Sequence, residues 1–239
     1  MKPIDPEILR LARARRGLYL AALSAPADKR VGLLALVAFD AELARIPQAV
    51  SEPMLGRIRL QWWVDALPGV TGGRPPSHPV AQGLAPWGLD LAALRGLVEA
   101  RNFDLDDGAT DVAEHLQYAH DGGGALALLM LDVLGVTDDE ARAAARAVGA
   151  AWALVQTLED GLRVASDADA AALRAEARGL LAQAHARVLS KALPRAQRRA
   201  ALPVLALARL ARRKLDDPSD PLGAGAVMSV WWGSATGRF

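Results

Sequence analysis

Few residues in this chain of 239 have the type and spacing that chemistry requires. There is no cysteine, which excludes disulfides, thiolate catalysis and cysteine-based zinc sites. His115 and His120 stand five residues apart, a spacing that does not place two zinc ligands on one helix face. The sequence also lacks the GxSxG elbow of serine hydrolases, the GxGxxG loop and the P-loop. We therefore predict no metal site built on histidine or cysteine and no nucleotide cofactor.

Carboxylates are the remaining candidates, because Mg²⁺ prefers oxygen ligands. Asp40 and Glu42 lie in one predicted helix, and Glu159 and Asp160 lie in another. Asp40 and Glu42 point about 200° apart on a helix, so they do not make a pair. These four residues are weak catalytic candidates.

The elements that carry these residues are predicted to be helical. Alanine, leucine and arginine dominate, whereas β-branched and aromatic residues are sparse, and no segment shows convincing period-2 alternation. We expect one all-α domain over residues 1–239, built from seven or eight helices. The predicted helices span 6–22, 28–45, 53–68, 91–102, 111–135, 137–164, 167–192 and 194–215.

Capping signals support several of these boundaries. Asp90 can cap the helix at 91, and Asp111 with Glu114 has capping-box spacing. Thr137 with Glu140 reads as a second capping box, and Gly135 as the glycine that ends the preceding helix. The triplet 122–124, all glycine, is either a kink with close helix packing or an opening in a cavity wall.

Charge and hydropathy limit the partners. Formal net charge is +1, so no global field favours nucleic acid. The N-terminus lacks the apolar h-region of a signal peptide, and no apolar run approaches the length of a transmembrane helix. We expect a cytoplasmic protein that contacts the inner membrane at most from its surface.

Two basic regions and one aromatic pair could mediate such a contact. The basic regions are Arg10, Arg13, Arg15 and Arg16, and then Arg195, Arg198, Arg199, Arg209, Arg212, Arg213 and Lys214. Each is either a solvated helix face or a binding surface for anionic phospholipid. Trp231 and Trp232 either dock on the protein's own body or anchor it to a membrane or partner.

Several blocks resemble the squalene/phytoene synthase family, whose members are all-helical enzymes that join two prenyl diphosphates. The blocks are Tyr19, the pair Ala38-Phe39, the run RLQWW at 59–63, His78-Pro79, Phe103-Asp104-Leu105 and the terminal Gly237-Arg238-Phe239. The resemblance implies the isoprenoid synthase fold, a helical bundle around a central apolar cavity. It also implies that Tyr19, Phe39, Arg45, Arg59, Trp62, Trp63 and Gln156 line the cavity or bind a ligand.

The acidic residues of the family's two motifs are mostly absent. In the first motif, Asp40 stands at the family's cysteine, and Ala44, Arg45 and Gln48 stand at its three aspartates. In the second, Asp160 is retained, but Val164 stands at its partner. The pattern is similar to a branch without these motifs, which includes an assembly factor of respiratory complex I.

The resemblance therefore implies a catalytically silent protein without a metal or other cofactor. It would bind an isoprenoid or lipid tail, or act as an assembly factor beside a respiratory-complex subunit. One alternative is a Mg²⁺-dependent prenyltransferase that uses displaced acids. Another is a purely structural helical interaction protein with a filled core.

Overall fold

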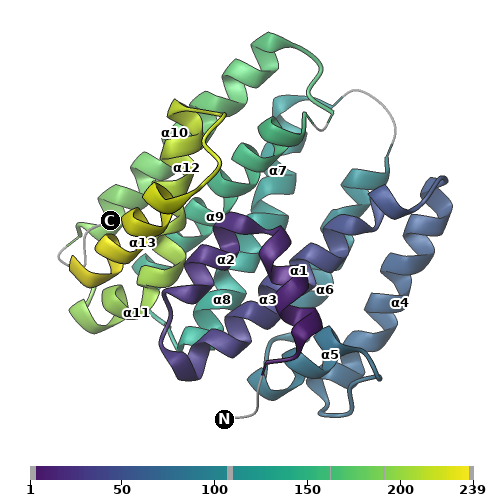
Figure 1. Cartoon of the computed structure of the whole chain (residues 1–239). Helices are drawn as coiled ribbons and strands as arrows, with labels where there is room; N and C mark the ends of the chain where they lie inside the picture. Colours follow the sequence, from purple (N-terminus) through teal and green to yellow (C-terminus); the bar gives the residue numbers. More distant parts are fainter. Residues whose placement is uncertain (1–3, 107–109, 162, 191, 237–239) are drawn as a thin grey trace. The chain divides into compact units, whose positions relative to one another are not determined.

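The computed structural model describes residues 4–106, 110–161, 163–190 and 192–236, and every regular element in these residues is helical. The all-α prediction is confirmed (Figure 1). The chain separates into two compact units, residues 1–107 and 108–239. None of the described helices is both long enough and apolar enough to cross a membrane.

Unit 1 is organised around α3 (Ala27–Arg45), which packs against α1, α2 and α5. Every residue from Gly32 to Ala41 is buried, so this part of α3 is enclosed on all sides. The remaining elements of the unit are α1 (Pro6–Ala14), α2 (Arg16–Leu23), η1 (Pro47–Ala49), α4 (Pro53–Thr71), α5 (Pro79–Leu84), η2 (Ala85–Trp87), α6 (Leu91–Ala100) and η3 (Arg101–Leu105).

Unit 2 is organised around α9 (Asp139–Asp160), which packs against α7, α8, α10, α11 and α12. Several buried positions of α9 are alanine, and their small side chains permit close approach of the neighbouring helices, among them Ala141, Ala144, Ala145 and Ala151. The other elements are α7 (Val112–Ala119), the π-helical segment η4 (His120–Gly124), α8 (Ala125–Leu134), α10 (Asp167–Val188), α11 (Arg195–Leu205), α12 (Leu207–Asp216) and α13 (Ala224–Thr236).

Two of the three predicted N-caps are confirmed. The Asp90 carboxylate accepts a 2.7 Å hydrogen bond from the Ala93 N–H, and Asp111 with Glu114 forms a complete capping box. Gly135 adopts φ 74° at the end of α8, a left-handed conformation that glycine favours. The capping box at Thr137 is wrong, because the Asp138 carboxylate caps α9 by accepting from the Ala141 N–H.

The predicted helix count is too low, because the described residues hold thirteen α-helices. The segment 6–22 divides at Arg15, and the segment 194–215 divides at Ala206, shortly after Pro203, which has no N–H to donate. Conversely, α4 does not end at Pro68 but continues to Thr71, since a proline in the last turn removes only one backbone hydrogen bond. The terminal motif at 237–239 lies outside the described residues.

The glycine triplet provides close packing between helices. A Cβ atom on Gly123 would lie 2.3 Å from the carbonyl oxygen of Gly149 in α9, and one on Gly149 would lie 2.2 Å from the Gly123 carbonyl oxygen. Backbone therefore meets backbone where η4 crosses α9. Of the two interpretations of the triplet, close packing is the one that the structure supports, and the π-helical turn at 120–124 is the kink.

We expect Gly123→Ala to lower the free energy of unfolding by about 1–3 kcal/mol, because the new methyl group must push two backbones apart. Gly122→Ala is the matched control, since a Cβ at that position meets nothing within 4 Å. The control should be neutral or stabilising by up to about 1 kcal/mol. Chemical denaturation of both variants measures the difference, and equal losses would contradict the close approach.

Candidate functional site

The candidate site begins with Asp40 in the buried part of α3, where the carboxylate is only 6% exposed. The Arg15 Nε–H donates to one carboxylate oxygen at 2.7 Å, and an Arg101 Nη2–H donates to the other at 2.5 Å. Arg101 also donates to Asp104 at 3.1 Å. Both oxygens of Asp40 are thus held by guanidinium groups that come from the α1–α2 break and from the start of η3.

This network determines the ionisation of Asp40. Burial alone would raise the pKa of the carboxyl group, but the charges and hydrogen bonds of Arg15 and Arg101 outweigh burial and lower the pKa below its usual value. Asp40 is therefore a stable carboxylate at neutral pH. A group held in this way is a poor proton acceptor, and its oxygens are engaged by arginine rather than open to a metal ion.

A pocket of about 290 Å³ lies at the C-terminal end of α3, and none of the residues of this network lines it. Glu42, Arg45, Ile46 and Ala49 line it, which are positions i, i+3, i+4 and i+7 of one helical face running on into η1. The remaining lining residues are Arg59, Trp62, Trp63 and His78. Asp40 and Glu42 consequently belong to different environments, as their angular separation predicts.

Aromatic rings form the apolar wall of the pocket. Trp62, Trp63 and His78 contact one another with ring centroids 4.9–5.5 Å apart. Trp63 is buried and also meets the edge of Phe39 at 5.0 Å, whereas Trp62 is 43% exposed. Such edge-on contacts are favourable and hold the indole rings in fixed orientations. The wall is therefore preformed.

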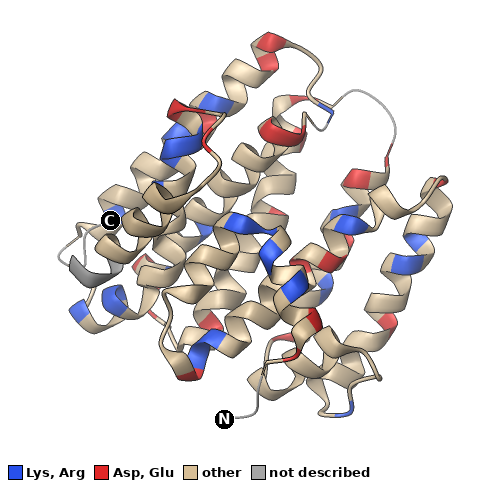
Figure 2. Ribbon diagram, viewed as in Figure 1, with Lys and Arg blue, Asp and Glu red and all other residues tan. Residues whose placement is uncertain are grey.

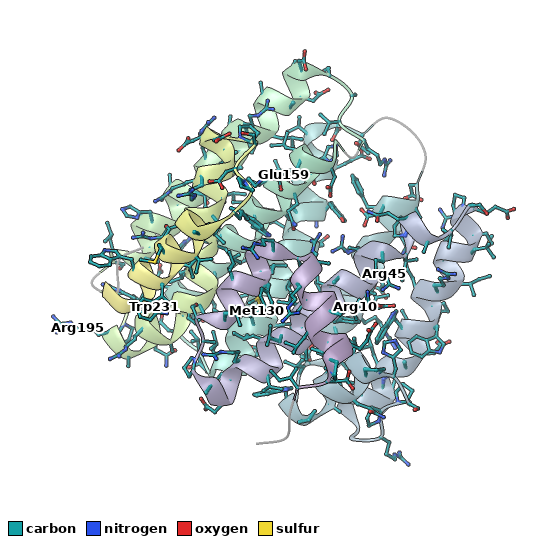
Figure 3. All side chains as sticks on the ribbon, viewed as in Figure 1. Arg10, Arg45, Met130, Glu159, Arg195 and Trp231 are labelled. Carbon is teal, nitrogen blue, oxygen red and sulfur yellow. The ribbon has the colours of Figure 1, made fainter. Side chains whose placement is uncertain are left out.

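Charge at the pocket is unbalanced towards positive. Arg45 pairs with Glu42 at 3.6 Å, while the Arg59 guanidinium makes only a 3.4 Å contact with the Ala49 carbonyl oxygen among the described interactions. Arg45 is labelled in Figure 3. The same figure labels Arg10 of α1, whose hydrogen bond to Glu7 lowers the pKa of the Glu7 carboxyl group. With one carboxylate and two guanidinium groups in its lining, the pocket favours an anionic group above an apolar wall.

The predicted site residues of α9 belong to unit 2. Glu159, which is labelled in Figure 3, forms an ion pair with Lys214 of α12. Both residues line a second pocket of about 320 Å³. Asp160 is exposed and Gln156 is half-buried. Among the described residues, no three histidine, aspartate or glutamate side chains gather closely enough to hold a metal ion. The central apolar cavity stays a prediction.

The structure brings together four of the seven predicted binding residues: Arg45, Arg59, Trp62 and Trp63 all line the first pocket. Phe39 supports the wall from behind, and Tyr19 is half-buried on α2 outside this lining. The sequence did not predict His78 as a pocket residue. Nor did it predict Arg15 and Arg101 as partners of Asp40, although a buried carboxylate in an apolar helix requires such partners.

Comparisons with known proteins identify the family and the fold of this chain. The squalene/phytoene synthase family matches residues 11–171, which is more than half of the chain. The chain belongs to the squalene/phytoene synthase family. The fold is similar to that of a dehydrosqualene synthase (TM-score 0.69, 14% identity, 96% of this chain and 95% of that one). It is also similar to a squalene synthase from Alicyclobacillus acidocaldarius (TM-score 0.63, 17% identity, 87% and 93%).

The curated relatives that match this chain are named as assembly factors and not as synthases. The chain is 34% identical over 145 residues to complex I assembly factor 6 of Bos taurus and of Homo sapiens. The match covers 59% of this chain and 44% of each relative, so the chain matches less than half of their length. The isoprenoid synthase fold and the family membership that the sequence predicts are confirmed.

We expect Asp40→Asn to lower the free energy of unfolding by about 3–5 kcal/mol at neutral pH, because the change leaves two largely buried guanidinium groups without their shared carboxylate. Asp106→Asn is the matched control, since Asp106 pairs with Arg57 at 2.7 Å where both side chains are at least 44% exposed. The control should lose less than about 1 kcal/mol. Denaturant titrations of both variants provide the comparison.

The pH dependence gives a second readout of the same network. The folded-state pKa of Asp40 is lowered, so its contribution is complete above the unfolded value of about 4 and is lost as pH falls through the folded value. The melting temperature of the wild type should therefore fall more steeply than that of Asp40→Asn on acidification below about pH 5. Parallel curves would contradict the assignment.

Proposed function

We propose that this member of the family is a catalytically silent binding protein that assists the assembly of respiratory complex I. The observation that carries the proposal is the lack of free carboxylates in the part of α3 and the following η1 where the family's first acidic motif would lie. Ala44, Arg45 and Gln48 stand where the family's aspartates would be, and Asp40 is held by Arg15 and Arg101. An arginine-bound carboxylate and neutral or basic neighbours do not provide the oxygen ligands that Mg²⁺ requires.

Curated relatives support the assembly role. Four mammalian proteins at 34–35% identity are each named as an assembly factor of NADH dehydrogenase (ubiquinone) complex I. The synthases of similar fold are only 14% and 17% identical, so they support the architecture and not the reaction. We therefore place this chain with the assembly factors in function.

The pocket of unit 1 supplies the binding site in this proposal. Its aromatic wall suits an isoprenoid or lipid tail, and Arg59 at its edge suits an anionic group attached to that tail. The volume of about 290 Å³ accommodates a short apolar segment rather than two long prenyl chains. Binding would then need no metal ion.

Calorimetric titration with farnesyl diphosphate, with and without Mg²⁺, tests this site. We expect binding that does not depend on Mg²⁺ and no release of diphosphate. Arg59→Gln should weaken binding about tenfold through loss of a charge-assisted contact. Arg57→Gln on the same helix is the matched control, because Arg57 pairs with Asp106 and does not line the pocket. Mg²⁺-dependent turnover would contradict the silent assignment.

Deletion of the gene in an organism that carries it tests the assembly role. We expect less assembled complex I on blue native gels and lower NADH dehydrogenase activity in membranes. The wild-type chain should restore both, and Asp160→Asn should restore them equally, because the retained motif acid has no catalytic task.

Either of two results would contradict the assembly proposal. Normal amounts of complex I in the deletion strain would exclude the role itself. Failure of Asp160→Asn to restore assembly, with normal folding of the variant, would instead indicate that the acid takes part in chemistry.

A further inference from the structure

Helix α13 has no charged residue anywhere along Ala224–Thr236. Ala226, Val230 and Gly233 are buried on one side, and the helix contacts α11 and α12. The other side exposes large apolar side chains. They are Val227 (39%), Met228 (61%), Trp231 (70%) and Trp232 (61%). A helix that is apolar on every side requires a second apolar environment in addition to its own protein.

The helices that contact α13 are strongly basic. Residues 195–214 contain seven arginines and lysines and no acidic residue. Arg209 reaches the Ser229 carbonyl oxygen of α13 at 3.5 Å, and Arg213 lies against Gly225 while pairing with Asp220. In Figure 2 the described part of α13 has no blue or red segment, whereas α11 and α12 carry blue segments that mark Lys and Arg.

Some of these cations are available for an external anion. Arg195 and Arg199 are exposed on α11, and Arg212 is half-exposed on α12. Among the described residues, no carboxylate forms an ion pair with any of these three arginines. Arg195 and Trp231 can be located in Figure 3. A row of indole and thioether groups is thus accompanied by unneutralised guanidinium groups.

We propose that this face is a docking surface for an anionic phospholipid bilayer. We define the α13 surface as Val227, Met228, Trp231 and Trp232 together with Arg195, Arg199 and Arg212. In the bound state α13 lies in the plane of the interface, its apolar side chains enter the boundary between headgroups and acyl chains, and the arginines contact lipid phosphates. Tryptophan is favoured at that depth because its ring is amphipathic.

Length and charge favour this occupant over the others. The thirteen residues of α13 extend about 20 Å, which is too short to cross a bilayer but suits a helix lying on its surface. A second copy of the chain would bring the same arginines face to face, and like charges oppose such a dimer. An anionic bilayer satisfies the apolar side chains and the cations together.

Co-sedimentation of the full chain with vesicles tests the proposal. One set of vesicles contains phosphatidylcholine alone, and the other contains phosphatidylcholine with phosphatidylglycerol. We expect binding to the anionic vesicles, a shift of tryptophan emission to shorter wavelength, and weaker binding at high salt. The double variant Met228→Gln/Trp231→Gln should bind the anionic vesicles at least about tenfold more weakly.

Two further variants separate the apolar and the electrostatic contributions. Met54→Gln/Ile58→Gln on α4 is the matched control, because these side chains are similarly exposed (61% and 58%) but lie in unit 1. It should bind as the wild type does. Arg195→Gln/Arg199→Gln should reduce binding to anionic vesicles and its salt dependence, with an unchanged melting temperature.

Several outcomes would overturn the proposal. They are equal binding to both kinds of vesicle, no binding to either, and an equal loss in the α4 control. A wild-type dimer in light scattering that Met228→Gln/Trp231→Gln converts to a monomer would assign the surface to self-association instead. Each result is independent of complex I assembly, so this proposal and the proposed function can fail separately.

Discussion

Compensation of one buried negative charge organises unit 1. A carboxylate in the enclosed part of α3 is costly unless it is paired, and Asp40 is paired twice. Arg15 can reach it because the chain breaks between α1 and α2, and Arg101 reaches it from the first residue of η3. Three segments distant in sequence are thereby held at one point, with α3 at the centre of the unit.

The same helix leaves its other face available for binding. Glu42, Arg45 and Ile46 follow Asp40 by helical steps that rotate them towards α4, where Trp62 and Trp63 stand. Because Glu42 and Arg45 neutralise each other, Arg59 gives the pocket its positive character. In the proposed function, alanine, arginine and glutamine stand in place of the motif acids, so the site lacks the carboxylates that would hold metal ions and its charge suits an anionic, partly apolar group.

Local chemistry decided which parts of this structure were predictable. Caps at Asp90 and Asp111 and the glycine at 135 depend on hydrogen bonds and dihedral angles within a few residues, and all three predictions are confirmed. The helix breaks at Arg15, whose side chain pairs with a carboxylate 25 residues away, and the periodicity of 6–22 gave no sign of either feature. The resemblance predicts Trp62 and Trp63 as pocket residues, whereas His78 reaches the pocket only through the tertiary fold. The sequence places Arg15 in a solvated or lipid-binding face, and its buried partner Asp40 becomes evident only in the structure.

The two basic regions show why charge in a sequence must be read together with its partners. Arg10 and Arg15, two of the four arginines of the first basic region, are paired within unit 1 with Glu7 and Asp40. In the second, Arg213 and Lys214 are also paired, yet Arg195 and Arg199 remain exposed on a helix that contacts α13. A net charge of +1 conceals this difference. The unpaired cations lie on helices that contact α13, which carries the exposed tryptophans. This combination of positive charge and exposed apolar surface is the ground for the proposed contact with an anionic bilayer.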